Sequence, residues 1–301
     1  MMTMRVSTME MANLAIYNLN QTSTNYQTAQ EVVSSGMAIN KPSDNPSGME
    51  QVLQLQHQNG LLTQFSSVMN SATSFMTTSD SALSSVTNLL QQARSIAVSA
   101  ANGTNDQQSM AALSAQVSDI IKQVANLGNT QLGNRYVFSG QRTETAPFVA
   151  GPGGTYTYAG GTSATQDATL QLNVGDGQSL TYNVTGDTTL TPALTQLQQL
   201  QQDIQMGQQQ NITNNDISGI DTQLNTVLGA RADLGSKIQR MQSELQTNSA
   251  QQLNNTQYLT QIQDANIPQA VVNLQTAQTA YQAALQTTSH AFQYSLLNYL
   301  P

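Results

Sequence analysis

Apolar residues recur every three or four positions along a central stretch of the chain. This spacing places one side chain per turn on the same face of a helix, and it holds for more than five heptads with one polar exception. At 1.5 Å per residue, a helix over residues 50–100 would be about 75 Å long. The stripe consists of Leu62, Phe65, Met69, Ala72, Met76, Ser79, Leu83, Val86, Leu90, Ala93, Ala97 and Ala100.

Two further stripes have the same spacing. A turn at Asn102 and Gly103 separates the second stripe from the first, and the third stripe comes much later in the chain. A single helix cannot bury such a face alone, so we expect the three helices to pack into a long, coiled-coil-like bundle. The second stripe is Met110, Leu113, Val117, Ile120, Val124 and Leu127, and the third is Ile217, Ile220, Leu224, Val227, Arg231, Leu234, Ile238, Met241 and Leu245.

Both ends of the chain carry stripes of their own. The C-terminal stripe has an alanine every seven residues, and small side chains allow another helix to approach closely. A second apolar line lies beside it, so this helix requires more than one partner, and the N-terminal helix supplies only one. The N-terminal stripe is Met9, Ala12, Ile16, Leu19, Ser23, Tyr26 and Val33; the C-terminal stripe is Ile267, Ala270, Leu274, Ala277, Tyr281, Ala284, Thr288, Ala291 and Ser295; the second line is Val271, Leu285, Phe292, Leu296 and Tyr299.

The unsatisfied apolar lines predict that the two terminal helices bind neighbouring copies of the chain. A polymer subunit can bury, against neighbouring copies, apolar side chains that a free subunit leaves exposed to water. The residues that we predict to form this assembly interface are Ile16, Leu19, Tyr26, Ile267, Val271, Leu274, Tyr281, Leu285, Phe292, Leu296, Leu297 and Tyr299.

The segment SSGMAINKPSDNPSGME, residues 34–50, interrupts the helical pattern. Gly36 can adopt the left-handed conformation that ends a helix, and Asn45 followed by Pro46 is typical of a helix start. We therefore predict a joint here, between a terminal helical layer and the long bundle.

Residues 131–190 have a different character, with glycine-rich stretches and alternating apolar positions. Leu170, Leu172 and Val174 alternate with polar residues, and the sequence Gly-Asp-Gly then leads into Leu180, Tyr182 and Val184. This pattern predicts a β-hairpin. The fold class that follows is mainly α with an inserted β-rich domain, divided into 1–35 plus 265–301, 36–130 plus 212–264, and 131–211.

Composition narrows the range of functions. Charged residues are only 9% of the 301, and the formal net charge is −8 with nine Lys and Arg, so clustered basic side chains that would bind nucleic acid are lacking. The chain has no cysteine, which excludes disulfides and thiolate metal sites. We recognise no cleaved signal peptide and no apolar stretch long enough to span a membrane.

Candidate catalytic chemistry is sparse. His57 and His290 lack the local partners of a metal site or catalytic triad, so we interpret them as surface residues. The segment Gly-Asp-Gly-Gln is a turn without the lysine of a phosphate-binding loop. We therefore expect no enzyme activity, no cofactor and no metal.

Arg231 occupies a stripe position between Val227 and Leu234, and Gly229 and Gly235 flank it. Each glycine costs a helix roughly 1 kcal/mol relative to alanine, so packing or a bend should compensate. Two interpretations remain open. The arginine either reaches out to solvent at a mild kink or makes a charged contact with a neighbouring subunit.

Several segments together resemble the bacterial flagellins. MRVSTMEMANLAIYNLN and SSGMAINKPSDNPSGMEQVLQL near the start, and GARADLGSKIQRMQ and ANIPQAVVNLQTAQTAYQAALQ near the end, are similar to the terminal segments of that family. LGNTQLGNRYVFSGQRTETAPF and the ending SLLNYLP resemble its hook–filament junction branch more closely. Such proteins usually begin at the equivalent of Met4, so residues 1–3 reflect either an upstream start or the choice of Met1 over Met4 as the assigned start, and both alternatives stay open.

The resemblance implies a structural subunit of the flagellum that lies between hook and filament. Its implied partners are copies of itself in a ring, the first hook-associated junction protein on one side, flagellin on the other, and an export chaperone. It also implies export through the flagellar apparatus to an extracellular position. The alternatives are a flagellin itself or a secreted enzyme carried on the β insert, whose carboxylates after Glu144 are only Asp167, Asp176, Asp187 and Asp203.

Overall fold

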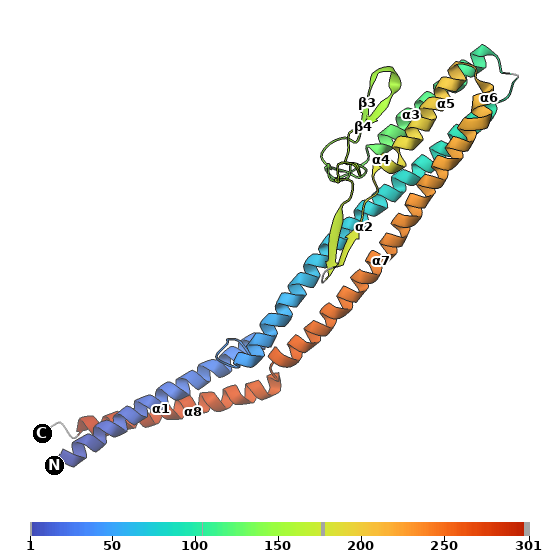
Figure 1. The fold of residues 1–301 in the computed structure, drawn as a ribbon. Helices are drawn as coiled ribbons and strands as arrows, with labels where there is room; N and C mark the ends of the chain where they lie inside the picture. The colour runs from blue at the N-terminus through green and yellow to red at the C-terminus, as the bar shows by residue number, and fades with distance from the viewer. Residues whose placement is uncertain (1, 104, 176–177, 298–301) are drawn as a thin grey trace. The chain divides into compact units, whose positions relative to one another are not determined.

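The computed structural model describes residues 2–103, 105–175 and 178–297, and side-chain environments for 10–103, 105–173 and 179–290 (Figure 1). The chain divides into two compact units. Unit 1 comprises Met1–Leu61 with Ala250–Pro301, and unit 2 comprises Leu62–Ser249. The predicted three-part division of the chain stays a prediction.

Long helices dominate the fold, and the predicted fold class, mainly α with small sheets in the middle of the chain, is confirmed. The helices are α1 (Met2–Ser35), α2 (Pro46–Ala100), α3 (Gln107–Gly128), α4 (Gly186–Thr189), α5 (Thr191–Gln205), α6 (Gln209–Asn211), α7 (Ile217–Gln263) and α8 (Ile267–Leu297), with a π-helical turn at Ile212–Asp216 and a 3-10 turn at Pro152–Gly154.

The core of unit 2 lies along the stripes that the spacing predicts. In α2 every stripe position from Met69 to Ala100 is buried, including Ser79, whose hydroxyl donates to the Phe75 carbonyl at 2.9 Å. That internal hydrogen bond explains how a polar residue is accommodated in the seam. In α7 the buried apolar residues recur at intervals of seven: Ile220, Val227, Leu234 and Met241.

Helix α5 corrects one part of the sequence interpretation, because residues 131–211 were predicted to be β-rich. The segment instead ends in a helix that packs along α3. Its N-terminus has Pro192 in the first turn, where the missing N–H costs nothing. Its buried face is Ala193, Leu194, Leu197, Leu200 and Ile204.

In the described part of the chain, the strands form three separate two-stranded antiparallel sheets. The pairs are β1 (Gln131–Leu132) with β2 (Arg135–Tyr136), β3 (Phe148–Ala150) with β4 (Tyr156–Tyr158), and β5 (Gln171–Gly175) with β6 (Gln178–Thr181). The predicted hairpin is confirmed, since Leu172 lies opposite Leu180 in the last pair. Its predicted turn residues Asp176 and Gly177 lie outside the described residues.

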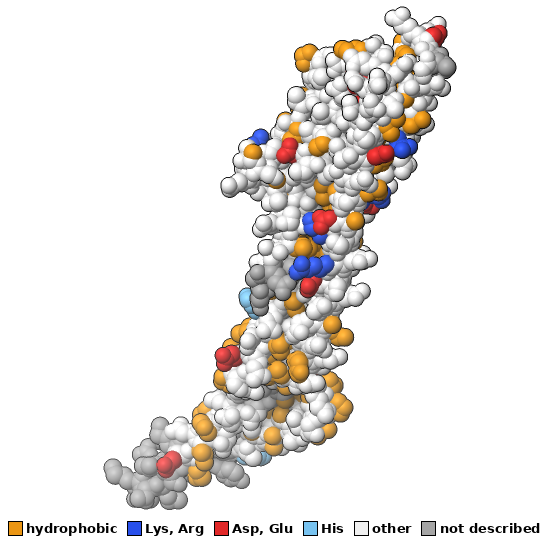
Figure 2. All heavy atoms as spheres, turned by 45° about the vertical axis from the view of Figure 1, so that its right-hand side comes forward, with side chains coloured by type: hydrophobic (Ala, Val, Ile, Leu, Met, Phe, Trp, Pro, Cys, Tyr) orange, Lys and Arg blue, Asp and Glu red, His pale blue; other side chains and the backbone are white. Residues whose placement is uncertain are grey.

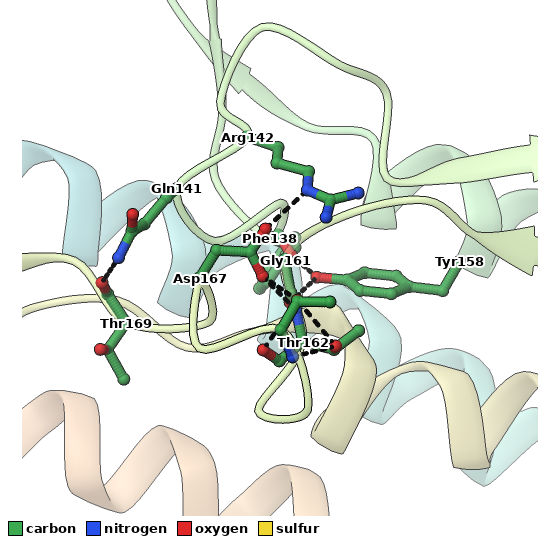
Figure 3. A network of polar contacts seen from close by, with 9 residues as sticks. Phe138, Gln141, Arg142, Tyr158, Gly161, Thr162, Asp167 and Thr169 are labelled. Atoms are coloured by element: carbon green, nitrogen blue, oxygen red, sulfur yellow. Dashed lines mark hydrogen bonds and ion pairs between the residues drawn. The ribbon is translucent and has the colours of Figure 1, made fainter.

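A network of polar contacts ties the loops between these sheets together (Figure 3). The Asp167 carboxylate accepts from the Arg142 guanidinium at 2.6 Å, from the Thr162 amide at 2.9 Å and from the Thr165 hydroxyl. The Tyr158 hydroxyl donates to the Phe138 carbonyl at 2.8 Å. Burial raises the pKa of Tyr158 to about 12, so this donor keeps its proton at any ordinary pH.

Gly161 is expected to be indispensable to this network. A Cβ at Gly161 would lie 2.1 Å from the Asp167 carbonyl oxygen, a backbone atom that cannot move without breaking the loop. We expect Gly161→Ala to destabilise unit 2 by roughly 2 kcal/mol through overpacking. Thermal unfolding followed by circular dichroism measures it. Gly103→Ala is the control, since a Cβ there would meet nothing closer than 4.0 Å; equal melting temperatures for the two variants would contradict the prediction.

Candidate assembly surfaces

Unit 1 is built from the pair of terminal helices and the joint beside them. In this unit α1 and α8 lie side by side and run in opposite directions (Figure 1). The rings of Tyr26 and Tyr281 stack across the pair, with centroids 5.9 Å apart and planes 3° from parallel. Among the side chains described in unit 1, only Ile39, Val52 and Ala270 are buried apolar residues. The unit therefore has almost no core of its own.

Large apolar side chains remain exposed on unit 1 instead. Figure 2 shows hydrophobic side chains along the visible face of its helices. Most of the large apolar residues that the described part of the chain exposes belong to this unit, although it is the smaller one. They are Met11, Leu14, Ile16, Tyr17, Met37, Leu53, Leu61, Leu253, Tyr258, Ile267, Val271, Val272 and Leu285.

The predicted interface residues fall into three groups. Leu19, Tyr26, Leu274 and Tyr281 are half-buried, and the tyrosines are engaged within the helix pair. Four others are 41–48% exposed and free to meet a second chain: Ile16, Ile267, Val271 and Leu285. The side chains of Phe292, Leu296 and Leu297, and all of Tyr299, lie outside the described residues.

Sequence reasoning missed the most exposed apolar residues of the pair. Met11, Leu14, Tyr17 and Val272 are 57–66% exposed. They fall between the stripe positions, so a search for one buried face passes over them. The signal was nevertheless present, because a helix with apolar residues outside its stripe has more than one apolar face.

A shallow cavity of about 440 Å³ lies between α1 and α8 next to the joint. Alanines and amide side chains form most of its lining, and Asp264 is the one ionisable residue in it. With a single ionisable residue, this lining does not contain an acid–base pair for catalysis. The cavity lining is Asn25, Thr28, Ala29, Val32, Ala38, Asp264, Ala265, Asn266, Gln269, Ala270 and Asn273.

The two helical ends of the chain match known protein regions. Residues 6–143 match the bacterial flagellin N-terminal helical region, and residues 217–300 match the bacterial flagellin C-terminal helical region. Together the two matches cover well over half of the 301 residues. The chain belongs to the bacterial flagellin family. The part between the two matches, residues 144–216, holds β3 to β6, α4, α5, α6 and the π-helical turn.

Individual flagellin-family proteins match to different extents. Flagellar hook-associated protein 3 of Escherichia coli K12 is 27% identical over 303 residues, which cover 93% of this chain and 95% of that protein. A flagellin of Clostridium tyrobutyricum is 32% identical over 120 residues, covering 40% of this chain and 32% of that flagellin. The crystal structure of Bacillus cereus FlgL, 22% identical, matches the fold over 69% of this chain and 99% of that one, with a TM-score of 0.58.

The predicted joint of this flagellin-family chain has a defined geometry. Gly36 ends α1 with φ of 75°, a left-handed conformation that glycine adopts without strain. The Asn45 side chain accepts from the Gly48 amide at 3.0 Å and so caps α2, which begins at Pro46. Two backbone hydrogen bonds fasten the joint to the end of α7 and the residues that follow it. The Ala38 amide donates to the carbonyl of Gln263, the last residue of α7, at 2.7 Å, and the Ala265 amide donates to the Gly36 carbonyl at 2.9 Å. That the joint positions the terminal layer in an assembly stays a prediction.

Arg231 has a partner within its own chain. Its Nε atom lies 2.9 Å from Oδ1 of Asp80 on α2, and both side chains are partly exposed. A second ion pair joins the same two helices with the charges exchanged. Here the arginine, Arg94, is on α2 and the aspartate, Asp221, is on α7, at 2.6 Å. The expected packing at Gly229 and Gly235 is not found, because a Cβ at either position would meet open space. A contact between Arg231 and a neighbouring subunit stays a prediction.

The described residues offer little other chemistry. His57 and His290 are exposed, as the sequence predicts. No group of three or more histidine, aspartate or glutamate residues able to hold a metal is found in the part of the chain that the structure describes. Within that part, no helix combines the length and the apolar character of a membrane span.

Proposed function

We propose that this chain is a structural subunit of the bacterial flagellum that joins the hook to the filament. The observation that carries the proposal is the near end-to-end match to a flagellar hook-associated protein 3, whereas the flagellin of Clostridium tyrobutyricum matches less than half of the chain. A protein that spans both helical ends and the middle segment of a junction protein has the parts that such a protein needs. The proposed location is the flagellum, reached by export without a cleaved signal peptide.

The terminal helices supply a means of assembly. Unit 1 leaves apolar residues exposed on α1 and α8, and α8 contains no Asp, Glu, Lys or Arg over its 31 residues. Copies can therefore approach through α8 without desolvating charges, and each Å² of apolar surface that they bury contributes about 25 cal/mol. In the proposed assembly unlike patches of neighbouring copies meet, and contacts of this kind close into rings or continue as helices.

The remaining partners follow from a position between hook and filament. We infer a ring of copies that contacts the first hook-associated junction protein on one side and flagellin on the other. An export chaperone would cover the terminal helices before assembly. Unit 2, with its own core, would keep its fold while unit 1 exchanges these partners.

Deletion of the gene tests the position in the organelle. A strain without this chain should be non-motile, retain hooks and release flagellin into the medium, because filament subunits are exported but find no junction to polymerise on. Complementation with the wild-type gene should restore attached filaments. Immunoblots of cells and medium with antiserum to the filament protein measure the outcome. If no filament protein appears in either fraction, the chain is the filament subunit and the proposal fails.

A further inference from the structure

Two aspartates are buried together where the chain turns from α5 into α7. Asp203 lies near the end of α5 and is 4% exposed, and Asp216 ends the π-helical turn that precedes α7 and is 1% exposed. A π-helical turn widens the helix by one residue, and such turns occur frequently at functional positions. Burial of two carboxyl groups at one turn of the chain calls for an explanation.

Among the described residues, the side chains that donate hydrogen bonds to the pair are neutral. The Gln196 amide donates to Oδ1 of Asp216 at 3.0 Å, and the Gln199 amide donates to Oδ1 of Asp203 at 3.2 Å. The Oδ2 atom of Asp216 is buried without a hydrogen-bond partner among the described atoms. The pair thus lacks the cation that normally accompanies a buried carboxylate.

The charged groups on the surrounding elements are engaged elsewhere. Arg94 of α2 pairs with Asp221 of α7 at 2.6 Å, and Lys122 pairs with Asp119 on α3 at 3.1 Å. Asp106 accepts from the Ser109 amide at the start of α3. The π-helical turn contributes no charged residue other than Asp216, and α6 contributes none. No described cation is therefore available to neutralise the two aspartates.

Two adjacent carboxylates without a cation cannot both stay ionised at low cost, because burial and mutual repulsion both favour a proton on one of them. Burial, with the charge of Asp203 as the next cause, raises the pKa of Asp216 from 3.8 to about 6. The protonated oxygen then has a use, since a carboxylic acid can donate the hydrogen bond that the carboxylate Oδ2 lacks.

We propose that Asp203 and Asp216 share one proton and that this shared proton latches the turn between α5 and α7. The latch closes a turn that also buries Ile204 and Ile212, both fully inaccessible. The intervening chain, with Gly207 at φ of 66° and only the single turn of α6, has little structure of its own to resist opening. Loss of the proton leaves two buried like charges, and the turn then opens more readily.

The sign of the pH effect follows from the raised pKa. An unfolded chain releases the Asp216 proton near pH 3.8, but the folded chain holds it up to about pH 6. The contribution of the pair is therefore fully present below about pH 4 and is lost as pH rises through about 6. This is opposite to the effect of the exposed ion pairs, which fail when acid protonates their carboxylates.

Melting curves of the full-length chain test the latch. Thermal unfolding would be measured at several pH values between 4.5 and 8 at constant ionic strength. The proteins compared are the wild type, Asp216→Asn, Asp203→Asn and the exposed-carboxylate control Glu144→Gln. An asparagine amide donates without needing a proton from solvent, so we expect Asp216→Asn to melt roughly 5 °C above wild type at pH 7.5 and to lose this advantage towards pH 4.5. Glu144→Gln should follow the wild type throughout.

Infrared spectroscopy tests the proton directly and does not depend on a change in stability. The difference between the wild-type and Asp216→Asn spectra at pH 5 should show the C=O band of one protonated carboxyl group, and this band should disappear from the difference by pH 7.5. The proposal is overturned if that band is missing, or if neither aspartate variant alters the pH profile. It is also overturned if Ca²⁺ or Mg²⁺ raises the wild-type melting temperature but not that of Asp216→Asn, because the pair would then be a cation site.

Discussion

A Leu83→Asp variant is expected to lose roughly 5 kcal/mol of stability and to melt far below the wild type. Leu83 lies in the middle of the α2 stripe and is completely buried within the core of unit 2. The substitution removes about 2 kcal/mol of apolar burial and places a carboxyl group where no partner awaits it, at a further cost of several kcal/mol. Thermal unfolding followed by the helical signal measures the loss.

The matched control is Ser85→Asp, two residues further along α2 at an exposed position. Its charge faces solvent, so the melting temperature should change little. A Leu83→Asp variant that melts with the control would show that the stripe is not the interior of the bundle.

A Val271→Glu variant is expected to lose more than nine-tenths of attached filaments while the isolated subunit keeps its stability. Val271 is 48% exposed on α8, so the glutamate remains in water as long as the chain is free. In the proposed assembly the same position is covered by another copy, where an unpaired carboxylate costs at least 2 kcal/mol and weakens binding more than tenfold. Filament counts by electron microscopy in a complemented deletion strain measure the effect.

Two comparisons separate assembly from folding in this experiment. The purified Val271→Glu subunit should melt with the wild type. Gln275→Glu adds the same charge at an exposed polar position on the same helix, and we expect a smaller loss of filaments. If filaments attach normally to Val271→Glu subunits, the second apolar line of α8 is not part of the assembly interface, whatever the motility of the deletion strain.

Repetition explains which parts of the fold could be predicted from the sequence. The α2 stripe repeats over many turns, so its period is clear even though Ser79 interrupts it. Helix α5 has four turns amid glutamines, and its leucines follow directly after strand-like alternation that ends at Val184. Taken alone, the spacing of the apolar residues from Leu194 to Ile204 predicts a helix.

Contacts between distant residues could not be predicted in the same way. The stripe predicts that Arg231 faces the seam between the helices. It does not predict that Asp80, 151 positions earlier in the chain, is the residue that Arg231 contacts there. The proximity of Asp203 and Asp216 likewise depends on a π-helical turn that no sequence pattern indicates. For the assembly surface, the stripes predict which residues are half-buried between α1 and α8. The residues that stay exposed on this pair can be identified only when the position of the partner helix is known.

The absence of charge on α8 affects how the flagellar junction would respond to its surroundings. Charged contacts between proteins weaken as salt rises, because dissolved ions screen them beyond about 8 Å at physiological ionic strength. An interface formed through α8 has no such contacts to screen on its own side. Its strength should therefore change little between fresh water and soil solution, whereas high concentrations of excluded salts such as sulfate should strengthen it. A cell that moves between these media would keep its filaments without adjusting the joint that holds them.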